Sequence, residues 1–247
     1  MYKFNQIFKM DIVNLLTNPM WLFYGLAFPF LLVLILGFLA SGSYGDAVTS
    51  YDYYGITMML FIVLNTATIS ANSFMEERIK SGNMRIIHSP VRPFSIHFSK
   101  LAASFVFASA CHTVVGLVLS LSLGVNYGGA DAVCVWVLML FAEFFASGLG
   151  IMLCCALKSE NITNQILSLV IMVLAILGGL FFPLDGLGAA MEQISNLSPV
   201  KWVSSAAFRM IFDNDFALFV PAIAILAALS AATVMISAKL FKTEDYI

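Results

Sequence analysis

Charged side chains are scarce in this chain: they make up 11% of its 247 residues, whereas apolar residues make up 61%. This composition excludes an ordinary water-soluble domain and makes the lipid bilayer the expected solvent. The net charge of −2 predicts no interaction with nucleic acid. Cysteine is also rare and shows no C-x-x-C spacing, so we expect buried free thiols and no metal site at Cys111, Cys134, Cys154 and Cys155.

The sequence also lacks a nucleotide-binding motif. No G-x-x-x-x-G-K-[ST] phosphate loop occurs, and no polar segment is long enough to form a soluble ATPase domain. Ser147 follows Glu143 by one helical turn, but no oxyanion or metal pattern accompanies these two residues, which disfavours an intramembrane enzyme. We therefore expect no catalytic residues in this chain.

Long apolar runs dominate what is present. A helix needs about 20 mostly apolar residues to cross a bilayer core, and runs of that length indicate helices because they do not alternate as barrel strands would. The predicted spans cover approximately residues 20–40, 52–75, 98–124, 132–157, 163–183 and 216–240. The predicted fold class is all-α integral membrane, with residues 1–247 forming one transmembrane domain of six spans.

Basic residues are distributed unevenly between the segments that join the spans. The segments on one side carry Lys3, Lys9, Arg78, Lys80, Arg85, Arg92, Lys100, Lys158, Lys239 and Lys242. On the other side, residues 41–51 and 125–131 contain no Lys or Arg, and residues 184–215 contain two. The positive-inside rule therefore predicts that both termini lie in the cytoplasm and that the chain resides in the cytoplasmic membrane.

Residues 1–17, before the first span, form a predicted amphipathic helix. Apolar side chains recur there at helical spacing, at Phe4, Ile7, Phe8, Ile12, Leu15 and Leu16. Such a helix is expected to lie in the plane of the membrane surface. Asn18-Pro19 then breaks the pattern, because proline disfavours helix in the residue before it, and the first span begins.

The largest polar loop between predicted spans covers residues 76–100. Within it, residues 83–88 are predicted to form about one and a half turns of helix between two turn signals. A solvated basic loop would satisfy the charge pattern equally well, but it leaves the apolar Met84, Ile86 and Ile87 unexplained. A short element that docks to a soluble partner is the alternative that explains them.

The segment 184–215 is unusually long and apolar for a connection. Two short helices, at 189–197 and 203–211, are predicted to dip back into the outer leaflet, because backbone at that depth must be hydrogen-bonded internally. Just before it, Phe181 and Phe182 stand at the outer end of the fifth span. They either close the exit as an apolar gate or pack against lipid and core.

A few polar residues lie inside the predicted spans. Asn65, Thr68 and Asn72 share one face of the second span, where they either line a translocation path or bond to neighbouring helices. His112 and Glu143 are the ionisable residues well inside the spans, and a charge there normally has a partner. Their similar depth predicts a hydrogen-bonded pair that locks the third span to the fourth or, alternatively, handles substrate or protons.

In their order and placement, several short fragments resemble the membrane subunits of the ABC-2 type exporter family. The resemblance covers nearly the whole chain. It rests on Asn18-Pro19 with Pro29, on Glu77-Arg78, Gly82 and Ser89-Pro90-Val91, on Phe181-Phe182-Pro183, and on Ile194-Ser195-Asn196-Leu197-Ser198-Pro199 with Arg209.

The resemblance implies a partnership with proteins that this chain does not encode. Each permease subunit would pair with a second copy or a homologous permease and rest on a separate ABC ATPase subunit, which binds ATP and Mg²⁺. The coupling helix would touch that ATPase through Glu77, Arg78, Gly82, Asn83, Met84, Arg85, Ile86, Ile87 and His88. The short N-terminal region favours a drug, antimicrobial peptide or lipid-like cargo over a polysaccharide.

Two other classes of function are compatible with an apolar chain of six spans. An ion-coupled secondary transporter or channel would usually carry several intramembrane charges or inverted repeats, and this sequence has one acid and one histidine deep in its spans. A passive assembly scaffold fits the composition equally well, and activity alone separates it from a transporter.

Overall fold

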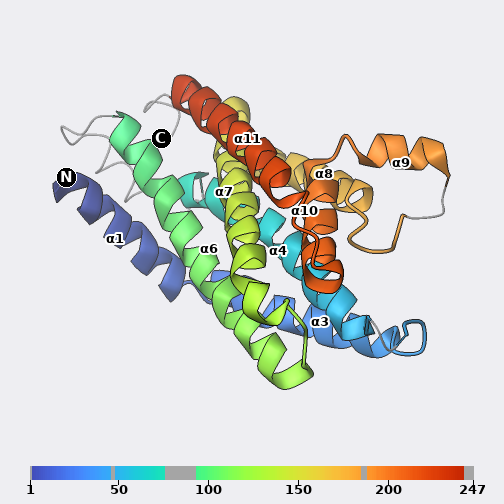
Figure 1. The fold of residues 1–247 in the computed structure, drawn as a ribbon. Coiled ribbons are helices and arrows are strands. Elements are labelled where there is room, and N and C mark those ends of the chain that lie inside the picture. The colour runs from blue at the N-terminus through green and yellow to red at the C-terminus, as the bar shows by residue number, and fades with distance from the viewer. Residues whose placement is uncertain (1, 46–47, 76–92, 185–187, 242–247) are drawn as a thin grey trace.

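Every regular element in the described residues, 2–45, 48–75, 93–184 and 188–241, is a helix (Figure 1). The structure is a computed structural model. Its α-helices are α1 (Tyr2–Thr17), α2 (Pro19–Leu22), α3 (Phe28–Leu39), α4 (Ser50–Met75), α6 (Pro93–Leu123), α7 (Ala132–Leu157), α8 (Glu160–Leu177), α9 (Ala189–Ser195), α10 (Pro199–Phe208) and α11 (Phe219–Leu240). Shorter turns of other helical types are η1 (Phe23–Ala27), η3 (Gly129–Asp131) and η4 (Arg209–Asp213).

Six helical segments are long and apolar enough to cross a membrane. They are Pro19–Leu39, Ser50–Met75, Pro93–Leu123, Gly129–Leu157, Glu160–Leu177 and Phe219–Leu240. The first is one continuous helix that runs through α2, η1 and α3. These segments confirm the predicted all-α membrane fold with six spans.

Two span boundaries differ from the sequence prediction by several residues. The third span begins at Pro93, within the segment predicted as the loop 76–100, because proline is well suited to the first turn of a helix. The fifth span ends at Leu177, before Phe181 and Phe182, because Gly178 caps the helix and Gly179 takes a positive φ of 69°. The chain after Gly179 is therefore free to turn back toward the bundle.

The centre of the bundle is formed by α4 and α7. In their most apolar stretches, 78% and 61% of the residues are buried, against 22% in the first, fifth and sixth spans. The two helices come so close that a methyl group at Gly150 would overlap the carbonyl oxygen of Ala67. Small residues at such crossings allow the backbones of membrane helices to pack directly.

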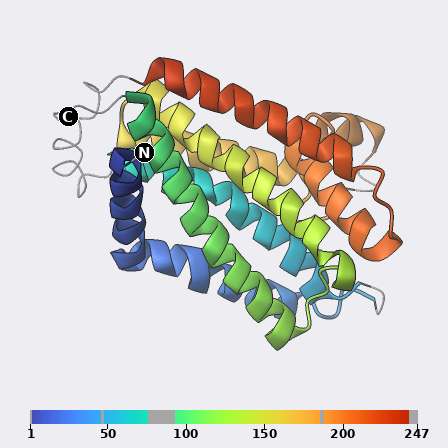
Figure 2. The ribbon, with the colours of Figure 1, turned by 60° about the vertical axis from the view of Figure 1, so that its left-hand side comes forward.

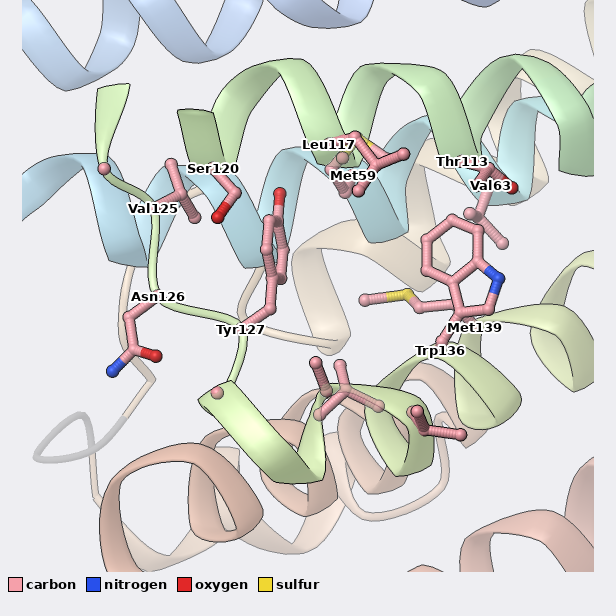
Figure 3. A pocket seen from close by; sticks show the side chains of 16 residues that line it. Met59, Val63, Thr113, Leu117, Ser120, Val125, Asn126, Tyr127, Trp136 and Met139 are labelled. Atoms are coloured by element: carbon pink, nitrogen blue, oxygen red, sulfur yellow. The ribbon is translucent and has the colours of Figure 1, made fainter. Parts of the chain in front are cut away.

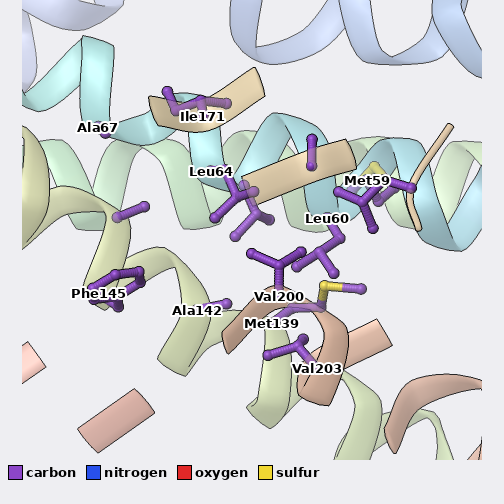
Figure 4. Close-up of a cluster of buried hydrophobic side chains, with 14 of the residues drawn as sticks. Met59, Leu60, Leu64, Ala67, Met139, Ala142, Phe145, Ile171, Val200 and Val203 are labelled. Carbon is purple, nitrogen blue, oxygen red and sulfur yellow. The ribbon is translucent and has the colours of Figure 1, made fainter. Parts of the chain in front are cut away.

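A continuous apolar core surrounds this crossing (Figure 4). Met59, Leu60 and Leu64 of α4 face Met139 and Ala142 of α7, with residues of α8 and α10 closing the cluster. The short helix α10 belongs to this core, because it buries Val200, Val203, Ala206 and Ala207. It therefore fixes the connection between α8 and α11 against the spans.

The helix α1 runs across one end of the bundle, and the chain turns sharply into the helix that follows it (Figure 2). Asn18 makes the turn: its side-chain oxygen accepts a hydrogen bond of 3.1 Å from the backbone N–H of Met20, and Pro19 starts the next helix. We call this end, where α4 and α7 finish and α6 and α8 begin, the α1 end. The position of α1 in a membrane plane stays a prediction.

The segment predicted as two re-entrant helices contains α9 and α10. The first agrees closely with the predicted 189–197, whereas the second begins at Pro199, four residues before the predicted start of 203. Proline at the first helical position explains the earlier start. In Figure 1, α9 projects from the bundle while α10 lies against it. Their depth in the outer leaflet stays a prediction.

Candidate functional site

One face of α4 carries polar residues. Phe61, Asn65, Thr68 and Asn72 follow one another at spacings of three or four residues, and the first three are half-buried on a helix whose other faces are almost entirely covered. The side-chain amides of Asn65 and Asn72 each donate 2.8 Å to a carbonyl one turn earlier in α4. The three predicted path residues thus form a real stripe, which ends on Phe61.

A second polar stripe, which was not predicted, runs along α8. Asn161, Gln165 and Ser168 are spaced by four and three residues and are all exposed. Asn164, beside them, is half-buried. The signal in the sequence is the helical spacing of these polar residues. It is easily overlooked, because the residues between them are apolar and the segment as a whole has the composition of a membrane span.

The two stripes are joined near the α1 end. The side chains of Asn72 and Asn164 exchange two hydrogen bonds, of 3.0 and 3.1 Å. Because α4 and α8 run in opposite directions, Thr68 and Ser168 then come at similar depths farther along. We call Asn65, Thr68 and Asn72 of α4, with Asn161, Asn164, Gln165 and Ser168 of α8, the polar strip.

An aromatic contact closes the other end of the polar strip. The rings of Phe61 and Phe181 meet edge to face, with centroids 5.3 Å apart. Phe181 is half-buried in this contact, whereas Phe182 is 46% exposed. Of the two predicted gate residues, the structure brings only Phe181 to the polar strip, and its partner Phe61 was not anticipated.

The exposed surface of α8 has two different sides. Ile162, Leu169 and Val173 form an apolar stripe with exposed fractions of 49%, 67% and 48%, which suits contact with lipid. The polar strip lies about a quarter turn away on the same helix. Exposed amides are costly in hydrocarbon, so that side is suited to contact with another protein chain or with a water-filled path.

A buried acid ties three spans together in the middle of the bundle. Glu143 of α7 accepts hydrogen bonds from Thr66 of α4, at 3.2 Å, and from Ser109 of α6, at 2.7 Å. His112 Nδ1 lies 2.7 Å from Glu143 Oε1, and both side chains are 2% exposed or less. The approach is poorly aligned for a hydrogen bond, so the two side chains are in close polar contact without one.

The structure therefore brings the predicted His112 and Glu143 pair together and adds two hydroxyl donors to it. Ser147 is buried one turn from Glu143, but its hydroxyl makes no hydrogen bond with any described residue. A nucleophilic hydroxyl is activated by a base within hydrogen-bonding reach, and no such contact joins Ser147 to Glu143 in the structure. The number of contacts made by Glu143 favours a role in holding the spans together.

A buried ion pair fastens α1 to the bundle. Lys100 Nζ lies 2.9 Å from Asp11 Oδ1 and donates to the carbonyl of Ser73 at 2.9 Å, with both charged side chains 3% exposed. The ammonium also lies 5.8 Å from the centre of the Phe74 ring. Burial raises the pKa of Asp11, and the charge and hydrogen bond of Lys100 oppose that rise.

We call Asp11, Lys100 and Ser73 the latch. It joins α1 to the last turn of α4 and to the second turn of α6. Of these helices, α4 precedes residues 76–92 and α6 follows them. The sequence predicts Lys100 in the loop 76–100, because a charge there fits the positive-inside pattern. The structure corrects this assignment, since Lys100 lies inside α6 and is buried.

The predicted coupling residues lie outside the described residues. They are Glu77, Arg78, Gly82, Asn83, Met84, Arg85, Ile86, Ile87 and His88. Within the described part of the chain, Cys111, Cys134, Cys154 and Cys155 are free thiols, and no three metal-binding side chains come together.

The fold and the buried polar contacts define a multi-pass membrane protein. The model of the ABC-2 type transporter family matches residues 2–212, and the chain belongs to this family. That match confirms the resemblance noted from the sequence and makes the chain the membrane-spanning permease component of an ABC transporter. A search of curated proteins gave no match.

Proposed function

We propose that this chain is the permease subunit of an ATP-driven exporter that moves a hydrophobic or amphipathic substrate out across the cytoplasmic membrane. The observation that carries the proposal is the polar strip, a run of amide and hydroxyl side chains on two apolar spans, of which Asn161, Gln165 and Ser168 are exposed. Lipid is a poor environment for these groups, so a partner subunit must cover them. A second copy, or a homologous permease, would face this strip and enclose a path between the two subunits.

The chemistry of the polar strip supports an uncharged or amphipathic substrate. Its seven residues are asparagine, glutamine, serine and threonine, with no charged side chain among them. Amides and hydroxyls exchange hydrogen bonds with polar parts of a substrate, while the apolar residues between them contact its hydrocarbon parts. A drug, an antimicrobial peptide or a lipid-like molecule fits these properties.

The latch supports a route by which a separate ATPase moves the spans. The distribution of Lys and Arg predicts that the α1 end lies in the cytoplasm, where an ATPase subunit binding ATP and Mg²⁺ would press on α1 and on residues 76–92. Because the latch joins α1 to both α4 and α6, a displacement of α1 also shifts α4, which carries Asn65, Thr68 and Asn72 of the polar strip. The contact of Phe61 with Phe181 then opens the far end.

Co-purification tests the partnership with an ATPase. The chain is co-expressed with candidate ATPase subunits, purified through its own tag, and assayed for ATP hydrolysis. We expect a complex whose ATPase activity is lost when residues 85–88 are replaced. A folded chain that recruits no ATPase would contradict the proposal.

Substitution of the polar strip tests the path. Leucine at Asn161, Gln165 and Ser168 is expected to abolish the stimulation of ATPase activity by transported compounds. The matched control changes the apolar stripe of the same helix, with Leu169→Ile and Val173→Ile, and should behave as wild type. Equal activity of the leucine variant and the control would show that this side of α8 does not serve transport.

A further inference from the structure

A cavity of about 620 Å³ lies between α4, α6 and α7, near the end of the bundle opposite α1 (Figure 3). None of the seven residues of the polar strip lines it. Tyr127, Trp136 and Met139 project into this space from α7 and the loop before it, and Met59 and Leu117 face them from α4 and α6. The cavity is therefore lined mainly by apolar and aromatic side chains.

The cavity exists because α6 and α7 stand apart near the loop that joins them, whereas farther along they meet through Ser109 and Glu143. The main partners of α7 are α4 and α11 rather than α6. Where α6 passes Trp136 it carries Gly116, and a Cβ atom there would lie at an ordinary contact distance of 3.6 Å from the indole. A larger residue at position 116 would fill space that the native sequence leaves open.

The loop of residues 124–128 forms a firmly held wall of the cavity. The backbone N–H of Asn126 donates 2.8 Å to Asp52, and the hydroxyl of Tyr127 donates 3.3 Å to the carbonyl of Gly55. Val125 fits against Gly55 so closely that a Cβ atom on the glycine would come within 2.5 Å of it. Collapse of this wall into the cavity would break all three contacts.

The mouth of the cavity faces sideways, between two spans. Leu117 of α6 and Val133 of α7 flank it and are 60% and 70% exposed. Both residues lie within membrane-spanning segments, so the mouth opens toward lipid chains. The polar side chains of Ser120 and Asn126 lie on the side nearer the end of the bundle, away from Trp136 (Figure 3).

We propose that this cavity binds one hydrocarbon chain of a phospholipid from the leaflet at that end. Protein interiors are close-packed, and each side chain that lines an empty space of this size loses van der Waals contacts on one side. Water is poorly held by an apolar lining, whereas bilayer lipid is always present at the mouth. The volume lies within the range of sites for small molecules, about 300–1,000 Å³. The polar rim at Ser120 and Asn126 places the lipid headgroup toward the end of the bundle.

Photolabelling with a phospholipid that carries a diazirine on its acyl chain tests the proposal. The purified full chain is reconstituted in phosphatidylcholine vesicles with this probe, irradiated, and mapped by peptide mass spectrometry. We expect adducts on Met59 and Met139, which are 3% and 5% exposed and lie behind the mouth. Lipid that only surrounds the protein reaches outward residues such as Leu121, which is 87% exposed.

Two blocking variants and one control make the result specific. Gly116→Phe fills the cavity and Leu117→Trp obstructs its mouth from the surface, so the adducts on Met59 and Met139 should be lost while those on Leu121 persist. Gly116→Ala leaves most of the space open and should label as wild type. The surface variant Leu117→Trp serves if Gly116→Phe does not fold.

Two results would overturn the proposal. The first is the absence of adducts on Met59 and Met139 in the wild type, or their persistence in a blocking variant. The second is protection of Met139 together with crosslinks between two copies of the chain, which would assign this face to a second subunit. Because labelling requires no transport, its outcome is independent of the proposed function.

Discussion

Removal of one partner of the latch should destabilise the protein strongly. In Asp11→Leu, the ammonium of Lys100 stays buried with the Ser73 carbonyl and the Phe74 ring but without a counter-ion. An uncompensated buried charge costs about 3–5 kcal/mol. At roughly 2–4 °C per kcal/mol for a chain of this size, the midpoint of thermal unfolding should fall by roughly 10 °C.

The opposite variant, Lys100→Met, should show a different dependence on pH. Burial already raises the pKa of Asp11, and loss of the Lys100 charge removes what opposes that rise. A carboxyl whose pKa is higher in the folded state stabilises the protein below the unfolded pKa, and this stabilisation is lost as the pH rises through the folded pKa. The variant should therefore unfold at a lower temperature at pH 8 than at pH 5, relative to wild type.

Thermal unfolding in detergent between pH 5 and pH 8 measures both effects. The double variant Asp11→Leu with Lys100→Met removes both charges and should unfold close to wild type, because an apolar pair replaces a buried ion pair at little cost. Lys239→Met removes an exposed lysine near the same end and is the matched control. A double variant as unstable as Asp11→Leu, or a pH-independent Lys100→Met, would refute the reasoning.

Three further predictions concern the spans. Glu143→Leu should lower the yield of folded protein, because the hydroxyls of Thr66 and Ser109 lose their acceptor, at a cost of about 1–3 kcal/mol each. A normal yield with lost transport would show a functional role instead. Alanine at Asn72 and at Asn164 should give a coupling energy of about 1 kcal/mol in a double-mutant cycle of thermal unfolding. Additive effects would argue against the two hydrogen bonds between these side chains. Gly150→Ala should prevent folding, judged by gel filtration, whereas Gly42→Ala, in open space, should not; equal yields would contradict the close crossing.

The membrane class, the six spans and the family followed from the sequence. A run of about 20 apolar residues has few alternatives to a spanning helix, because every backbone group in lipid must be hydrogen-bonded within its own segment. The turn at Asn18-Pro19 was equally local, since it depends on an N-cap and a proline. The fifth span was predicted too long, because Gly178 and Gly179 do not interrupt an apolar run. In the structure, Gly178 caps the helix and Gly179 takes a positive φ, so the helix ends before Phe181.

The partners of the polar side chains depended on the tertiary structure. The pair of His112 and Glu143 could be anticipated, because adjacent spans of known direction place residues at comparable depth. Lys100 could not be matched with Asp11, 89 positions away, because that contact requires α1 to lie across the start of α6. The polar stripe on α8 and the cavity beside Trp136 likewise depend on which helix faces are covered. Hydropathy determines which segments enter the membrane, whereas packing between them determines which side chains meet.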